Sequence, residues 1–332
     1  NFNAIGFPDY PKFGFATDSI NVMANLFVPF QGAGIGVIDK QEVMSGGPAT
    51  IIFYVLGPTE FGFVPGDNDG PKFDGVTPTF FTNNFTSGSS IDVWEIEPDY
   101  GSPADSTIAE VANIAVAPFD TDLCPAPRET CIPQPGSGTG TFPNNIPFLE
   151  AIADRMMHRA QMRHYNGGRM YAMLNHTVDA DGTGVAGVRW YEMSNPRNRG
   201  WRLRRQNTYS PDSDSRWMGS IALTKSGTTC MGYSISSQTR YPSIGIVGRR
   251  GRGNSMNTNE VIAFDGNVAA NVQRQTGRWG DYSSVSIDPV DDTCWFTTEY
   301  AKPNSFIGER FGWATRIIHF TPTPAGGGIL GR

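Results

Sequence analysis

Charged residues are scarce in this sequence: Asp, Glu, Lys and Arg make up only 17% of its 332 residues. The formal net charge is −6, which argues against a nucleic-acid partner because phosphate binding needs clustered Lys and Arg. Basic stretches at 197–205 and 249–252 contain Gly or Asn, which favours solvated loops over contacts with phosphate or an acidic polymer. No run of about 18 apolar residues occurs, so no membrane span is expected.

Local signatures of several enzyme classes are also missing. The sequence has no CxxC motif, no Cys/His cluster with zinc spacing, and no GxSxG, HExxH or P-loop motif. Long helices are disfavoured because the chain carries 39 Gly and 24 Pro. The one good helical pattern, at 148–157, is short and grades into a strand. What remains is the composition of many short strands joined by tight turns.

Internal repetition is the strongest positive signal. Three segments start with an arginine and continue with a strand, a polar turn and a second strand. These arginines, Arg155, Arg216 and Arg278, are 61 and 62 residues apart. Such a period, with four short strands per unit, is typical of a propeller blade. The sequence therefore predicts an all-β protein, a β-propeller of four-stranded blades.

About five blades are visible, two of them in the less regular N-terminal part. The last unit ends after its third strand, so six or seven blades are expected in the complete ring. We expect residues 1–321 to form a propeller that is incomplete on its N-terminal side, and 322–332 to be a Gly/Pro-rich tail or linker. An upstream fragment of the same precursor, or a second copy of the chain, would complete the ring.

Four cysteines point to an oxidising compartment. Cys124 and Cys131 bracket a short Pro-rich loop that a disulfide easily closes. Cys230 and Cys294 occupy comparable positions in two repeat units. They either pair across neighbouring blades or remain two buried free thiols.

Several sequence motifs resemble those of a mostly uncharacterised family of large secreted bacterial β-propeller-like proteins. The motifs that carry the resemblance are DYPKFGF, NHTVD with AGVRWYE, RWMGSIAL, YPSIGIVGR and RWGDYSSVSIDPVDD. The resemblance implies secretion and further propeller-like sequence upstream, and it brings no activity or catalytic residue. The pair Cys124 and Cys131, followed by IPQPG, also resembles that family's pattern.

The repeat arginines are the candidate ligand-binding residues. If Arg155, Arg216 and Arg278 converge on the propeller axis, their guanidiniums would bind a carboxylate or sulfate through bidentate contacts. The alternative is that each stacks on an aromatic residue and forms salt bridges between blades, which Trp217 and Trp279 favour.

Catalysis on a glycosidic bond would require two opposed carboxylates, one with a raised pKa. Asp281 and Glu299 are the candidates for this pair. His176 is a further candidate base, although a structural histidine is the simpler interpretation.

Two acidic turns are candidate calcium sites, through Asp67 and Asp69 in one turn and Asp179 and Asp181 in the other. Neither has the closing Glu of an EF-hand, and Asx-rich β-turns explain both equally well. No cofactor is otherwise required by the sequence.

Two functions follow. The first is a secreted or cell-surface module without enzymatic activity, such as an adhesion, matrix or filament subunit, with glycans or other surface proteins as partners. It predicts exposed aromatic patches around Phe61, Phe63, Phe80 and Phe81. The alternative is a hydrolase or lyase acting on polysaccharides or sialosides, with its site at the propeller axis.

Overall fold

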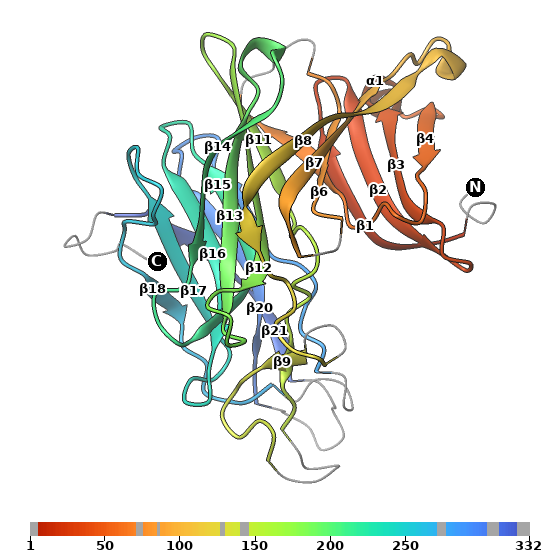
Figure 1. The fold of residues 1–332 in the computed structure, drawn as a ribbon. Coiled ribbons are helices and arrows are strands. Elements are labelled where there is room, and N and C mark those ends of the chain that lie inside the picture. Colours follow the sequence, from red (N-terminus) through yellow and green to blue (C-terminus); the bar gives the residue numbers. More distant parts are fainter. Residues whose placement is uncertain are drawn as a thin grey trace. The chain divides into compact units, whose positions relative to one another are not determined.

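The structure is a computed structural model, and strands dominate it (Figure 1). It describes residues 6–70, 76–84, 87–126, 130–139, 146–270, 277–303 and 312–323. Within these ranges, no helix combines the length and the apolar character that a membrane crossing requires.

The first blade is an antiparallel four-stranded sheet in chain order. Its strands are β1 (Phe7–Phe15), β2 (Ser19–Phe27), β3 (Gly32–Asp39) and β4 (Ile51–Val55). Strand β1 alternates exposed and buried residues, whereas β2 and β3 are buried on both faces. Helix α1 (Lys40–Ser45), which the sequence analysis did not predict, connects β3 to β4. It is capped by the Asp39 carboxylate and ends at Gly46, whose φ is 77°.

The second and third blades form one continuous eight-stranded sheet in the order β14-β13-β12-β11-β5-β6-β7-β8. The strands of the second blade are β5 (Val64–Asp69), β6 (Thr79–Thr82), β7 (Gly88–Glu97) and β8 (Thr107–Phe119). Those of the third blade are β11 (Ala160–Tyr165), β12 (Arg169–Asp179), β13 (Ala186–Ser194) and β14 (Arg202–Tyr209). The first strands of the two blades, β5 and β11, pair in parallel.

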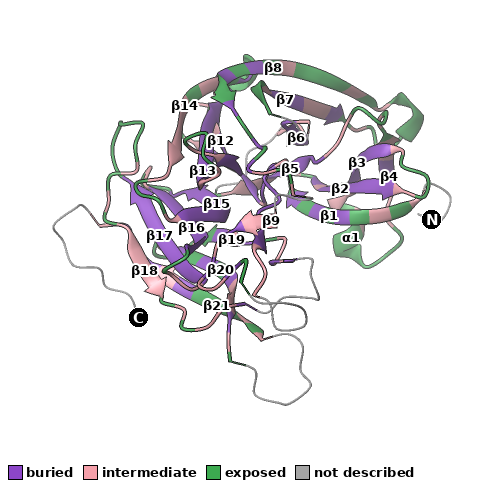
Figure 2. Cartoon of the chain, turned by 60° about the horizontal axis from the view of Figure 1, so that its bottom comes forward, coloured by how far each residue is buried: buried purple, intermediate pink, exposed green. Residues whose placement is uncertain are grey.

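The fourth blade is again a four-stranded meander, and the fifth has three strands among the described residues. These strands are β15 (Ser215–Leu223), β16 (Thr229–Ser236), β17 (Ser243–Arg249), β18 (Val261–Phe264), β19 (Ser284–Ile287), β20 (Cys294–Ala301) and β21 (Trp313–Phe320). Strands β15, β16 and β17 are buried throughout (Figure 2). The predicted all-β fold of four-stranded propeller blades is confirmed.

The helix predicted at 148–157 is wrong. Strand β10 (Leu149–Glu150) pairs there with β9 (Thr130–Ile132), and turns follow it. Ile152 and Met157 belong to a core cluster, and the Met157 N–H donates to the Asn175 carbonyl. The apolar residues that suggested an amphipathic helix are therefore buried in an irregular loop.

The prediction of an exposed aromatic patch is also wrong. Phe63, Phe80 and Phe81 are fully buried, and Phe61 is half-buried. Phe63 and Phe80 belong to the core cluster of the first two blades, because both lie on or beside strands that face that core.

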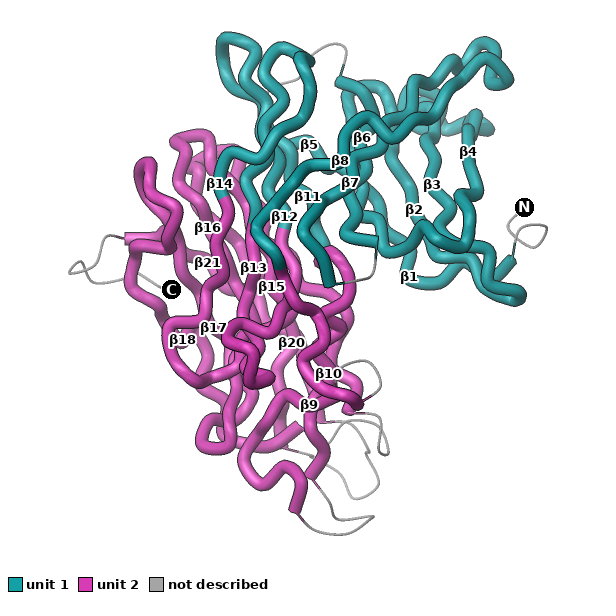
Figure 3. The backbone as a smooth tube through the Cα atoms, viewed as in Figure 1, with its two compact units in different colours: residues 1–118, 158–174, 191–205 teal, residues 119–157, 175–190, 206–332 magenta. Residues whose placement is uncertain are grey.

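The chain divides into two compact units, coloured separately in Figure 3. The first comprises residues 1–118, 158–174 and 191–205, and the second 119–157, 175–190 and 206–332. Strands β12, β13 and β14 contribute residues to both units. The expected Gly/Pro tail lies almost entirely outside the described residues.

Both expected cysteine pairs are present as disulfides. Cys124 is bonded to Cys131 within a short loop. Cys230 of β16 is bonded to Cys294 of β20, with the two Cα atoms 6.5 Å apart. The second bond therefore links the fourth and fifth blades, and the free-thiol alternative is excluded.

Removing the Cys230–Cys294 disulfide is expected to destabilise the protein more than removing the Cys124–Cys131 disulfide. The Cys230→Ala/Cys294→Ala variant should lose about 4 kcal/mol of unfolding free energy, because a bond between residues 64 apart restricts the unfolded chain strongly. The Cys124→Ala/Cys131→Ala variant, with a separation of 7, should lose about 2–3 kcal/mol. Denaturant unfolding of both variants measures this difference, and equal losses would contradict it.

Candidate functional site

Two carboxylates, Glu150 and Asp281, lie beside Arg278 in the second unit, and a third, Glu299, contacts the neighbouring Gly280. Arg278 and Asp281 lie in the loop at 277–283 that leads into β19, while Glu150 ends β10 and Glu299 lies on β20. We call Glu150, Asp281 and Glu299 the carboxylate cluster. Two of its members, Asp281 and Glu299, are the acid–base pair expected from the sequence.

The loop that carries Arg278 and Asp281 is anchored at both ends. The Trp279 indole is buried, lies 5.8 Å from the Trp217 ring, and donates from Nε1 to Ser234 Oγ at 3.1 Å. At the other end, Ser283 Oγ donates to the Met218 carbonyl at 2.7 Å. The loop therefore holds its charged side chains on a rigid support.

Arg278 binds two of the carboxylates. Its Nη2 atom lies 2.8 and 2.9 Å from the two Asp281 carboxylate oxygens, and its Nε lies 3.6 Å from Glu150 Oε2. Glu150 is fully buried, whereas the side chains of Arg278 and Asp281 are 41% and 22% exposed. Asp281 is thus a solvent-accessible carboxylate whose charge is compensated by a guanidinium.

Glu299 is in a different electrostatic environment. Its Oε1 accepts the Gly280 N–H at 2.6 Å, and a Cβ at position 280 would lie only 2.4 Å from Oε2, so glycine is needed there. Burial raises the pKa of Glu299, and the nearby Asp281 charge raises it further, against the lowering effect of the Gly280 hydrogen bond.

The cluster therefore contains two carboxyl groups in contrasting environments. Glu299 is buried and has a raised pKa, whereas Asp281 is partly exposed and ion-paired with Arg278. Such a difference between neighbouring carboxyl groups is the basis for assigning an acid and a base. The arrangement is chemically suited to general acid–base catalysis.

The other two repeat arginines also have carboxylate partners within this chain. Arg155 Nε lies 2.8 Å from Asp154 Oδ1. Arg216 is fully buried, with Nε 2.8 Å from Glu260 Oε1 and Nη1 2.7 Å from Asp212 Oδ1. These ion pairs are local and do not join neighbouring blades, so both the inter-blade salt bridges and the joint binding of an external anion by the three arginines stay predictions.

His176 is a buried residue of β12. Its ring packs edge-on against Phe119, with the ring centroids 4.7 Å apart. Burial, reinforced by the positive charge of Arg189, lowers the pKa of His176 to about 3. The imidazole is therefore neutral at ordinary pH, and no contact joins it to the carboxylate cluster among the described residues.

Asp67 and Asp69 already have a cationic partner. Arg159 Nε lies 2.6 Å from Asp67 Oδ2, and Arg159 Nη2 lies 2.5 Å from Asp69 Oδ1. A guanidinium thus stands where calcium was expected. Across the described parts of the chain, no group of three or more His, Cys, Asp or Glu side chains is placed to hold a metal ion.

Asp179 and Asp181 form hydrogen-bonded turns. The Asp179 carboxylate accepts the N–H groups of Asp181, Gly182 and Gly184 at 2.9–3.2 Å. Asp181 accepts the Thr183 N–H at 2.9 Å. This geometry matches the Asx-turn explanation, and calcium binding here stays a prediction.

The sequence analysis missed two features of functional interest. Glu150 lay within the expected helix, and no motif marks it as a partner of Arg278. The basic stretch at 197–205 was interpreted as a solvated loop, but several of its arginines line hollows in the surface of the first unit. The clustering of arginines in that stretch is the sequence feature that could have indicated a binding site there.

No protein-family model and no curated protein matches this chain. Solved structures do match, all at low sequence identity. A GH32 β-fructofuranosidase of Bombyx mori has a TM-score of 0.41 and 8% identity over 99% of this chain, which spans 63% of the length of that enzyme. A thermostable family-43 glycoside hydrolase has a TM-score of 0.38 and 9% identity, over 99% of this chain and 95% of its own.

An α-L-arabinanase of Penicillium chrysogenum has a TM-score of 0.41 and 10% identity, over 93% of this chain and 92% of its own. The comparisons contradict the non-enzymatic adhesion or filament module that the sequence favoured: the three structures named here are glycoside hydrolases, the class of the alternative. At these TM-scores the likeness concerns the fold, and the function proposed below is argued from the residues of this chain.

Proposed function

We propose that this protein is a secreted hydrolase that cleaves glycosidic bonds in a polysaccharide, with Glu299 as the general acid and Asp281 as the ionised carboxylate. The observation that carries the proposal is the contrast between these two groups, one with a raised pKa and one paired with Arg278. The two disulfides support secretion, since such bonds persist in oxidising compartments.

The proposed reaction needs no chemistry beyond these side chains. Glu299 donates its proton to the oxygen of the leaving sugar as the glycosidic bond breaks. Asp281 stabilises the positive charge that develops on the other sugar ring. A water molecule then supplies the hydroxyl of the new reducing end and gives its proton to the Glu299 carboxylate, which restores the acid. Arg278 orients Asp281 through its two hydrogen bonds, and is therefore a positioning residue.

The test is a screen of the purified protein against neutral polysaccharides, acidic polysaccharides and sialosides, followed by measurement of new reducing ends. On the substrate that is cleaved, Asp281→Asn should be slower by about 10²- to 10⁴-fold. Asp265→Asn is the matched control, because the Asp265 side chain is 75% exposed and far more weakly paired. Failure to cleave any substrate, or equal rates for Asp281→Asn and wild type, would overturn the proposal.

A further inference from the structure

Two adjoining hollows in the first unit are lined by arginines. The smaller, about 250 Å³, includes Arg169, Arg202 and Arg204 in its lining, and the larger, about 650 Å³, includes Arg169, Arg197, Arg199 and Arg202. They share Arg169, Pro196 and Arg202, so they form one continuous depression, which we call the arginine groove. Its combined size is in the range of known ligand sites.

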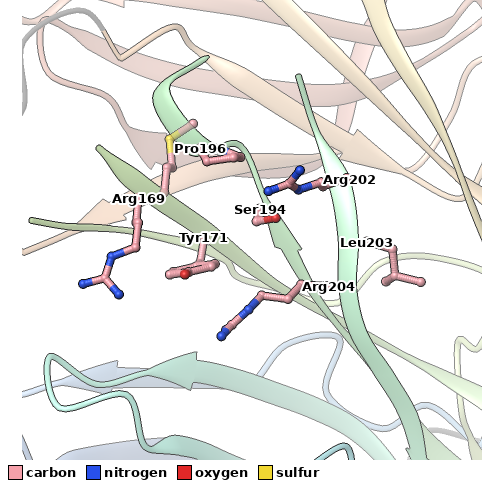
Figure 4. A pocket seen from close by; sticks show the side chains of 8 residues that line it. Arg169, Tyr171, Ser194, Pro196, Arg202, Leu203 and Arg204 are labelled. Atoms are coloured by element: carbon pink, nitrogen blue, oxygen red, sulfur yellow. The ribbon is translucent and has the colours of Figure 1, made fainter. Parts of the chain in front are cut away.

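Figure 4 shows the smaller hollow from close by. Arg169 projects from β12 and Arg202 from β14, with Ser194 and Pro196 between them. The Arg204 guanidinium lies over the Tyr171 ring, 4.7 Å from its centroid. Strands β12 and β14, which lie on either side of β13, thus place positive charge on both sides of the groove.

Most of this charge is uncompensated. Within the described part of the chain, Arg169, Arg197, Arg199 and Arg202 have no carboxylate within ion-pair distance, although all four are exposed. Other arginines of the chain, including Arg159, Arg216 and Arg278, are paired. A protein of net charge −6 therefore keeps an unpaired cluster of positive charge at one place.

Two carboxylates contact residues of the groove lining, and neither neutralises its exposed arginines. Glu95 accepts the Trp201 indole N–H at 2.8 Å. Glu192 is fully buried and is shared by Arg204 and Arg205. Burial lowers the pKa of Arg204, and the positive charges of Arg205 and Arg169 also lower it, against the effect of the nearby tyrosines. The repulsion among these guanidiniums would be relieved by an anion in the groove.

The turn between β13 and β14, which carries several of these arginines, has an unusual backbone conformation. Arg197 and Asn198 have φ angles of 55° and 52°, a region that costs a non-glycine residue of order 1–3 kcal/mol. The Arg197 N–H donates to the Gly168 carbonyl at 2.7 Å, and the Gly200 N–H donates to Asn195 Oδ1 at 3.0 Å. The turn is fixed by these contacts, so its arginines are pre-positioned for a ligand.

We propose that the arginine groove binds an acidic polysaccharide whose sugars carry carboxylate groups. Guanidiniums bind such oxyanions through paired hydrogen bonds, and their spacing along a groove suits charges repeated along a polymer. Tyr171 and Trp201 supply aromatic surface in the groove lining. This binding function goes beyond the proposed hydrolysis and does not depend on it.

Calorimetric titration with polygalacturonate tests the proposal, with uncharged dextran as the comparison polymer. Wild-type protein should bind polygalacturonate, more weakly as salt is added, and should not bind dextran. Arg199→Gln/Arg202→Gln should lower the affinity about 10²- to 10⁴-fold, the loss expected for two charged hydrogen-bonding groups. The exposed pair Arg250→Gln/Arg252→Gln is the matched control and should bind like wild type.

Unchanged affinity in the Arg199→Gln/Arg202→Gln variant would overturn the proposal, and so would equal binding of dextran. Single-stranded DNA that binds as tightly as polygalacturonate and competes with it would also overturn it, because the groove would then recognise polyanions in general. The Asp281→Asn variant separates the two functions. It should bind polygalacturonate normally even if the proposed hydrolysis fails.

Discussion

The Glu299→Gln variant is expected to cleave the substrate of the wild-type protein about 10²- to 10⁴-fold more slowly, the usual contribution of a general acid. Glutamine has the size of glutamate, and its amide oxygen can still accept the Gly280 N–H. The substitution therefore removes the transferable proton without removing the contact that holds the side chain. The measurement is kcat and KM on the cleaved polysaccharide, and the loss should appear in kcat.

The pH profile distinguishes an acid from a merely structural residue. Only protonated Glu299 can donate, so wild-type activity should fall as the pH rises through its pKa, which burial raises above the ordinary value of 4.5. The residual activity of Glu299→Gln should lack this alkaline decline. An alkaline decline that is unchanged in the variant would assign the titration to another group.

Stability should respond to the same substitution with a defined sign. A carboxyl group whose pKa is raised by folding binds its proton more tightly in the folded state, so wild-type stability is lost as the pH rises above 4.5 and through the raised pKa. Glu299→Gln lacks this loss. The unfolding free energy of Glu299→Gln minus that of the wild type should therefore increase between pH 5 and pH 8. Denaturant unfolding at several pH values measures this difference.

The blades could be predicted from the sequence because their pattern is local. Strand β1 alternates buried and exposed residues, and the arginines at 155, 216 and 278 recur at almost equal intervals. The wrong helix at 148–157 shows the limit of this reasoning. The pattern there is apolar on one helical face, but burial in the core favours an irregular loop over a helix.

The candidate site was predictable only in part. Asp281 and Glu299 were chosen as possible acid and base, yet their contrast depends on the burial of Glu299 and on the ion pair of Asp281 with Arg278, both of which the fold creates. Likewise, nothing in the sequence near Asp67 indicates that Arg159, 92 residues away, supplies its cation. Long-range pairing of this kind comes from the way blades pack, which a local pattern does not encode.

The ion pairs of Arg159 connect the second and third blades. Arg159 precedes β11, and Asp67 and Asp69 lie on β5, the strand that pairs with β11 in parallel. Burial lowers the pKa of Arg159, but the two carboxylates raise it by more, so the net shift is upward. Gln161 Nε2 also donates to Asp69, at 2.8 Å.

Arg159→Met is accordingly expected to lower the unfolding free energy by about 3–5 kcal/mol, because two mostly buried carboxylates lose their closest cation and only the longer Arg163–Asp69 contact, at 3.8 Å, remains. Denaturant unfolding measures the loss, and Arg250→Met, an exposed arginine, is the control that should change little. Adding Asp67→Asn and Asp69→Asn to Arg159→Met should recover much of the stability, since the uncompensated charges are then gone. If they recover nothing, Arg159 stabilises the blades through packing alone.

The same variant decides whether this turn can act as a calcium site. In the wild type the guanidinium occupies both carboxylates, so added calcium is expected to leave the unfolding free energy unchanged. In Arg159→Met the carboxylates of Asp67 and Asp69 lose their closest cation, and Asp69 keeps only Arg163 at 3.8 Å and Gln161 at 2.8 Å. A hard cation with oxygen ligands can then replace the lost charge. Calcium that stabilises the wild type, and no longer does so after Asp67→Asn, would instead restore the calcium site that the sequence suggested.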